Sequence, residues 1–138
     1  MDMKHAHVVW FEIPVKSLDR ASNFYSQLLG ITITRIKLYQ TEYGVFDKNQ
    51  TGIGGTLKVD ESKVGKGATL FFFVNVLSDA MDTAITCGGK IILEKTLLKQ
   101  VDEHGKTILA HNLIDNQVGY YAEILDSEGN QISLYSHY

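Results

Sequence analysis

Residues 9–31 read VWFEIPVKSLDRASNFYSQLLGI, and this stretch sets the pattern for the rest of the chain. It begins with apolar residues at every second position, as in a half-buried strand: Phe11, Ile13 and Val15. Ser17 is typical of a helix N-cap, and Gly30 suits the left-handed conformation that ends many helices. Between them, apolar side chains recur at helical spacing: Leu18, Ala21, Tyr25, Leu28 and Leu29. The stretch predicts a strand over about 7–15 and a helix over about 18–29.

A similar pattern returns in residues 70–89. The Phe-rich run 70–76 is strand-like, Ser78 is a candidate helix cap, and Gly88-Gly89 follows a shorter apolar stripe. Superposing Val15 on Val76 aligns Ser17 with Ser78. We therefore predict an internal duplication within one domain of residues 1–138. One module covers about 7–60, a polar linker about 60–67, and a second module about 68–138.

Further strand patterns complete each half. In the first half they fall at 31–39, 43–46 and 53–59, and in the second at 90–93, 119–125 and 131–135. Residues 97–117 hold the turn-like sequence DEHG and indicate an inserted hairpin or flap. Each half is then strand, helix and three strands, which predicts an α+β fold with helices on one face of mostly antiparallel sheets. The other face is left free to line a cavity.

Composition narrows the classes of partner. The chain has 138 residues and a net charge of −3, without the basic patch expected of a nucleic-acid-binding protein. No apolar run approaches the roughly 20 residues of a membrane span, so we expect neither nucleic acid nor a membrane as partner. The single cysteine, Cys87, cannot form an internal disulfide, and a reducing cytoplasm is the expected location.

Two segments resemble one known family. Trp10–Val15, followed by the sequences LDRA and FY in the helix, resembles the opening of the glyoxalase/bleomycin resistance protein/dioxygenase proteins, the vicinal oxygen chelate superfamily. Residues 126–134, DSEGNQISL, resemble the superfamily's closing Asp-Pro-Glu-Gly-Asn turn and strand, with Ser127 in place of proline. The opening is most similar to an uncharacterised glyoxalase-related branch. The resemblance implies two paired βαβββ modules forming a curved sheet around a cavity, and a homodimer.

The resemblance also assigns metal-ligand positions. The superfamily's metal enzymes place one ligand on the first strand and one on the last strand of each module, and they bind a divalent cation with His and Glu. The corresponding positions here are Trp10, Thr56, Phe71 and Ser133. None of these is His, Glu, Asp or Cys, so we expect no cofactor, while a divalent metal at an atypical site stays possible. No spacing among the histidines matches a zinc motif.

Glu12 is the one candidate catalytic residue. By strand alternation it shares a face with Trp10, and that face is expected to line the cavity. A carboxylate beside an indole in an apolar pocket can act as a general base, or bind a cationic ligand when ionised. The alternative is a structural ion pair with Arg20, Arg35 or a lysine.

Three functions remain open at this point. The first is metal-independent binding of a small organic ligand in an aromatic cavity, with Glu12 as polar anchor and with these lining residues: Trp10, Thr56, Phe71, Phe73, Ser133 and Tyr135. The second is a lyase, isomerase or dioxygenase of the glyoxalase type, with an atypical metal site or with Glu12 as general base. The third is an interaction module in which the aromatic residues fill the cavity as core.

Overall fold

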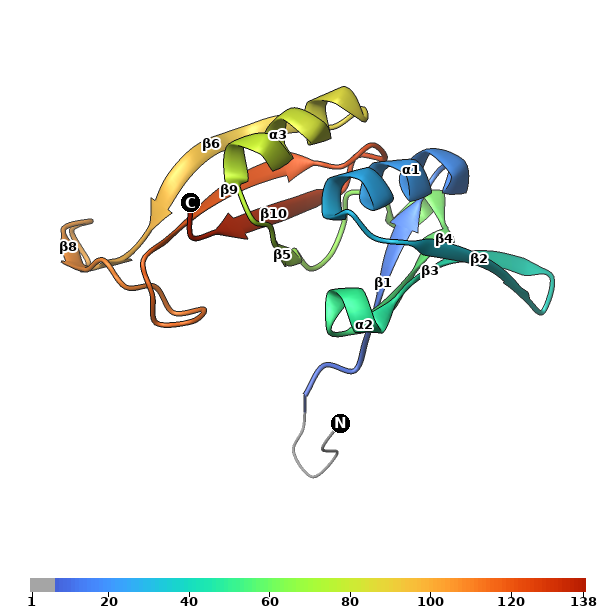
Figure 1. The fold of residues 1–138 in the computed structure, drawn as a ribbon, viewed down its shortest axis with the longest axis horizontal. Helices are drawn as coiled ribbons and strands as arrows, with labels where there is room; N and C mark the ends of the chain where they lie inside the picture. The colour runs from blue at the N-terminus through green and yellow to red at the C-terminus, as the bar shows by residue number, and fades with distance from the viewer. Residues whose placement is uncertain (1–6) are drawn as a thin grey trace.

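The computed structural model describes residues 7–138 and arranges them in two four-stranded sheets that lie side by side. Two helices, α1 (Leu18–Leu29) and α3 (Leu77–Thr86), lie next to each other over one face of these sheets (Figure 1). The opposite face carries no helix of comparable length. The α+β class predicted from the sequence is confirmed.

The first sheet contains β1 (Trp10–Val15), β2 (Ile33–Leu38), β3 (Thr41–Phe46) and β4 (Gly54–Val59). Its strand order is β1-β4-β3-β2, and only β1 and β4 run parallel. This order follows from the helix, because α1 carries the chain from β1 across the sheet to the far edge at β2. A one-turn helix, α2 (Lys48–Thr51), interrupts the step from β3 to β4.

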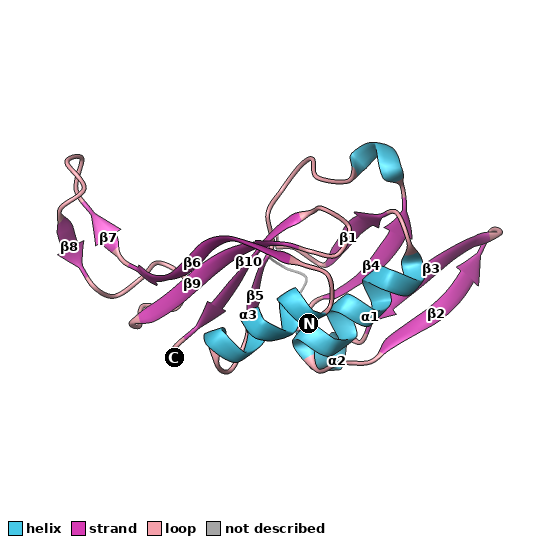
Figure 2. Cartoon of the chain, turned by 90° about the horizontal axis from the view of Figure 1, so that it is seen from above, coloured by secondary structure: helices cyan, strands magenta, loops and turns pink. Residues whose placement is uncertain are grey.

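The second sheet repeats this topology with β5 (Phe71–Phe73), β6 (Lys90–Leu98), β9 (Gly119–Leu125) and β10 (Gln131–Ser136). Its order is β5-β10-β9-β6, with only β5 and β10 parallel. The 3₁₀ helix η1 (Glu61–Lys63) lies in the connection between the halves. The predicted inserted hairpin is present as β7 (Gln100–Val101) and β8 (Thr107–Leu109), which project from the end of the molecule (Figure 2).

Helix α1 forms as its sequence predicts. The Ser17 side chain accepts a hydrogen bond from the amide of Arg20, and Gly30 adopts φ 63°, a left-handed value that glycine reaches without a steric cost. The apolar stripe of α1 packs on the first sheet, where Tyr25 and Phe46 lie 5.6 Å apart between ring centroids. The core continues across the junction of the sheets, because Tyr25 also contacts Phe72, at 5.9 Å.

The internal repeat differs in register from the prediction. Val76, not Ser78, is the N-cap of α3, and no side chain caps this helix. Because α3 begins at Leu77, the two helix starts align Leu18 with Leu77, and Val15 then corresponds to Val74. Ser78 lies inside the first turn. Among residues 7–138, no helix is long and apolar enough to span a membrane.

Candidate ligand-binding site

The candidate residues predicted from the sequence lie on the sheet faces opposite α1 and α3, but in two groups. Trp10, Glu12 and Thr56 belong to the first sheet, and the others belong to the second: Phe71, Phe73, Ser133 and Tyr135. Strand pairing decides this division, because side chains opposite each other across a sheet share a face. The two groups therefore lie on different sheets, and a groove beside the first group extends from Trp10 and Glu12 on β1 to Gln131 and Ile132 on β10.

In the first sheet, Glu12 lies opposite Thr56, and Trp10 lies opposite Gly54. The Thr56 hydroxyl donates a hydrogen bond to Glu12 Oε2 at 3.5 Å, at the long end of the accepted range. Glu12 and Trp10 line a groove of about 350 Å³ between the two sheets, together with Lys66 and Gln131. Both side chains are solvent-exposed, so a single chain does not enclose Glu12 in the apolar pocket that the general-base hypothesis assumes.

The second sheet carries an aromatic face, which we define as Phe71, Phe73, Tyr121 and Tyr135. Phe71 lies opposite Ser133, and Phe73 lies opposite Tyr135. The Phe71 ring is 6.4 Å from Tyr121, and the Phe73 ring is 6.1 Å from Tyr135. Phe71 and Phe73 nevertheless remain 51% and 58% exposed. Burial of such rings normally stabilises a fold, so two half-exposed rings held side by side form a surface suited to stacking.

The segment 110–118 folds against one end of the aromatic face. Tyr135 is only 3% exposed, because its hydroxyl accepts a hydrogen bond from Asn112 and donates one to Asp115 Oδ1, at 2.7 and 2.8 Å. The buried Tyr135 ring therefore packs against Phe73 and is not itself exposed to a ligand. Beside it, an apolar hollow of about 340 Å³ is lined by Phe71, Leu98, Lys99, Asn112, Leu113 and Ile114.

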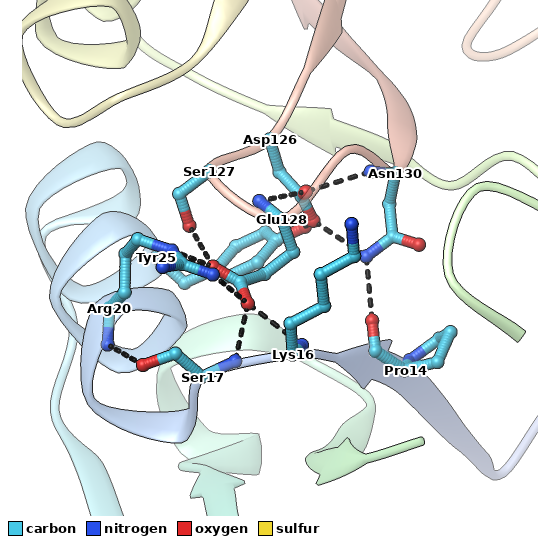
Figure 3. Close-up of polar contacts among 9 residues, drawn as sticks. All are labelled: Pro14, Lys16, Ser17, Arg20, Tyr25, Asp126, Ser127, Glu128 and Asn130. Atoms are coloured by element: carbon cyan, nitrogen blue, oxygen red, sulfur yellow. Dashed lines mark hydrogen bonds and ion pairs between the residues drawn. The ribbon is translucent and has the colours of Figure 1, made fainter. Parts of the chain in front are cut away.

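The turn 126–130 joins the two modules. Figure 3 shows Glu128 reaching from this turn to the start of α1, where it accepts hydrogen bonds from the amides of Lys16 and Ser17 at 2.8 and 2.6 Å. Arg20 donates from Nε and Nη2 to the same carboxylate, at 2.6 and 2.9 Å. Burial alone would raise the pKa of Glu128, but the hydrogen bonds from Arg20, Ser17 and Lys16 outweigh it and hold the pKa below its ordinary value.

Asp126 and Asn130 complete this connection (Figure 3). The Tyr25 hydroxyl donates to Asp126 Oδ2 at 2.5 Å, and Asn130 donates to the Pro14 carbonyl oxygen at 2.7 Å. Burial, and then the nearby Asp126 carboxylate, raises the pKa of Tyr25 well above its ordinary value. We call the contacts of Asp126, Glu128 and Asn130 with the first module the inter-module clamp. The carboxylates of Asp126 and Glu128 therefore serve in structural hydrogen bonds.

Comparison with known proteins places the chain in a family. The model of the Glyoxalase/Bleomycin resistance protein/Dioxygenase superfamily matches residues 6–134. The chain belongs to this superfamily. No curated protein matches the sequence.

Solved structures of several proteins share the fold. A hypothetical protein, SA1046 from S. aureus, is 18% identical with a TM-score of 0.64, covering 98% of this chain and 99% of that one. A glyoxalase/bleomycin resistance protein from Albidiferax ferrireducens T118 is 19% identical with a TM-score of 0.62, covering 94% and 98%. A glyoxalase-related enzyme from Fulvimarina pelagi is 12% identical with a TM-score of 0.62, covering 94% and 87%. At these identities, the likeness establishes the fold alone.

The positions that correspond to the superfamily's metal ligands do not fit a divalent cation. In the register of the structure, which aligns Leu18 with Leu77, Trp10 corresponds to Thr69 and not to Phe71 as predicted. Trp10 has no ligating side-chain atom, and Thr56, Thr69 and Ser133 supply only neutral hydroxyls, whereas the superfamily's metal enzymes bind the cation with His and Glu. Within the described residues, no group of three or more His, Cys, Asp or Glu side chains is arranged to hold a metal ion.

Sequence reasoning missed the polar residues beside the aromatic face. His137 Nε2 lies 2.7 Å from Asp115 Oδ2, and the His137 ring is 5.4 Å from the ring of Phe73. We call Asn112, Asp115, Tyr135 and His137 the acid–histidine cluster. Asn112 and Asp115 lie in the insertion, whereas Tyr135 and His137 lie at the end of β10 and just after it. No short sequence motif therefore contains all four. The resemblance of residues 126–134 to the superfamily's last strand drew attention to Ser133 instead.

Proposed function

We propose that this superfamily member binds a small planar organic ligand on the aromatic face of the second sheet, without the superfamily's usual metal. The observation that carries the proposal is the pair of half-exposed rings, Phe71 and Phe73, beside an apolar hollow of about 340 Å³. Ligand sites combine apolar walls with a few polar groups, and offset or edge stacking on an aromatic ring contributes about 0.5–1.5 kcal/mol beyond area burial. Lys99 and Asn112 supply polar groups at the rim.

We further propose that the protein works as a homodimer in which a second copy covers the aromatic face. Around that face, Leu113, Ile114 and Val118 are 87%, 53% and 43% exposed. Contiguous exposed apolar surface of this kind is characteristic of interaction sites rather than of monomer surfaces. A covering copy would also enclose the ligand. The reducing cytoplasm suggested by the single Cys87 stays the proposed location.

A thermal-shift experiment tests the binding proposal. Metal-stripped protein is heated alone, with an excess of nickel, zinc, manganese or iron(II), and with small planar aromatic compounds. A ligand that binds only the native state raises the midpoint of unfolding. We expect aromatic compounds to raise it in the wild type but not in a Phe71→Ala/Phe73→Ala double variant, and we expect no metal to do so. Sedimentation equilibrium measures the dimer separately.

An enzyme of the glyoxalase type, a lyase, isomerase or dioxygenase, is the second candidate. The observation that favours it is Glu12, which lies with Trp10 and Lys66 in the groove between the two sheets. In this account, Glu12 is the general base, and a partner copy excludes water from the groove. A metal-dependent midpoint shift that Glu12→Gln abolishes would support this candidate against the first.

A further inference from the structure

The acid–histidine cluster beside the aromatic face has one nitrogen atom that the fold does not use. Asp115 receives donors on both carboxylate oxygens: the Tyr135 hydroxyl on Oδ1 at 2.8 Å, and His137 Nε2 on Oδ2 at 2.7 Å. The amide of Gln117 donates to Oδ1 as well, at 3.2 Å. Asp115 is therefore held as a carboxylate, and the hydrogen bonds from His137 and then Tyr135 outweigh burial and lower its pKa.

The ionised Asp115 fixes the tautomer of His137. A carboxylate accepts hydrogen bonds but cannot donate one, so the proton of a neutral His137 ring lies on Nε2. The Tyr135 hydroxyl does not compete for this proton, because it already donates to Oδ1 and accepts from Asn112. The other ring nitrogen, Nδ1, then carries a free lone pair.

Nδ1 of His137 is accessible to a ligand. Within residues 7–138, this nitrogen makes no hydrogen bond, and the only buried side-chain polar atom without a partner is Ser22 Oγ. An unpartnered Nδ1 must therefore reach solvent, in agreement with the 30% exposure of the His137 side chain. The ring lies edge-on to Phe73, which is 58% exposed. An acceptor nitrogen thus adjoins the stacking surface.

We infer that His137 takes a proton from the bound ligand, and that the ligand is therefore a planar molecule with a weakly acidic hydroxyl group, a phenol or an enol. The proton moves from the ligand oxygen to Nδ1, which leaves an anionic ligand beside an imidazolium ring. The Asp115 carboxylate stabilises that imidazolium through Nε2–H. The titratable groups that contact His137 are Asp115 and Tyr135. Asp115 is a positioning residue, since it acts through His137. This inference rests on the proposed binding at the aromatic face.

Two matched probes test it: 4-nitrophenol, whose phenolate is yellow and whose neutral form is colourless, and 4-nitroanisole, which lacks the hydroxyl. At about pH 7, where an ordinary imidazole is mostly neutral, wild-type protein should bind both probes and raise the phenolate fraction of the first above that of the free probe. His137→Gln should bind 4-nitroanisole normally but lower the affinity for 4-nitrophenol by about tenfold and abolish this increase in the phenolate band. His111→Gln, a nearby exposed histidine, should match the wild type.

The Asp115→Asn variant distinguishes a positioning role of Asp115 from a purely structural one. This variant should still bind 4-nitroanisole but should show a reduced phenolate fraction and an altered pH profile of the band. An equal phenolate band in the wild type and in His137→Gln would overturn the inference and leave the binding proposal intact. Failure of both probes to bind would instead overturn the proposed function. If His137→Gln does not fold, nitrogen NMR of wild-type His137 replaces it, and Nδ1 must become protonated when 4-nitrophenol binds.

Discussion

Ser17 and Glu128 lie 111 residues apart in the sequence, yet the Ser17 amide donates to Glu128 Oε1 at 2.6 Å. The contact joins the N-cap of α1 to the turn before β10, and it brings a carboxylate to the positive end of a helix dipole. The inter-module clamp therefore orients the two sheets with respect to each other. A change that weakens the clamp alters how the aromatic face lies relative to Trp10 and Glu12 on the first sheet.

Replacing Glu128 by Gln should destabilise the protein. The side chain is buried and accepts hydrogen bonds from two amides and from Arg20, so removal of its charge weakens several charge-assisted bonds at once. We expect a loss of about 2–4 kcal/mol in the free energy of unfolding, measured with urea. Glu61→Gln, on the exposed η1, is the control and should change stability by less than about 0.5 kcal/mol. Equal stability of the two variants would mean that the clamp adds little.

The clamp should also make stability depend on pH. The pKa of Glu128 is lower in the folded protein than its ordinary value of 4.5, so the unfolded chain binds the proton more readily. The stabilisation is therefore fully present above pH 4.5 and is lost as the pH falls below it. Denaturant unfolding of the wild type and of Glu128→Gln at a series of acidic pH values measures this, and the two stabilities should converge at low pH. Parallel curves would assign the acid sensitivity to other groups.

Gly119→Ala should disturb the acid–histidine cluster through packing alone. A Cβ atom at this position would clash with the Tyr135 hydroxyl oxygen, so Tyr135 must move and release Asn112 and Asp115. We expect a loss of about 1–3 kcal/mol in unfolding free energy. The chemical shifts of the His137 ring should change in the same variant, which NMR can detect. An unchanged His137 signal would show that the ring is held independently of Tyr135.

Removing the Tyr25 hydroxyl tests the buried arm of the clamp. In Tyr25→Phe, Asp126 Oδ2 loses its 2.5 Å donor but keeps the amide group of Asn130, which lies 3.0 Å away. We expect a cost of about 1–3 kcal/mol, because a buried carboxylate loses one of its donors without loss of ring volume. Thermal or urea unfolding gives the value, and a change below about 0.5 kcal/mol would contradict the assigned role.

The sequence predicted those helices and strands whose determining residues lie close together in the chain. Helix α1 has a cap, an apolar stripe and a terminal glycine in one stretch, and its bounds match the prediction. Helix α3 lacks a side-chain cap, so the serine pattern misplaced its start at Ser78. The one-turn helix α2 has no apolar stripe to predict it; the Asp47 side chain accepts a hydrogen bond from the Asn49 amide at its start.

The candidate site was predictable only in part, because its geometry depends on pairing between distant strands. Alternation put Phe71 and Phe73 on one face, but it could not reveal how close that face lies to Trp10 and Glu12 of the first module. The roles of Glu128 and His137 depend on contacts across 111 and 22 residues, which carry no local signal. The superfamily resemblance predicted the fold but not the side chains that make up the candidate site.

NMR can show directly where on the protein a planar ligand binds. Nuclear Overhauser effects from 4-nitroanisole to the protein distinguish the two groups of candidate residues, because Phe71 and Phe73 lie on the second sheet and Trp10 lies on the first. We expect contacts to the Phe71 and Phe73 rings that vanish with Phe71→Ala/Phe73→Ala. Contacts confined to the Trp10 indole, or binding that the double variant leaves unchanged, would contradict it.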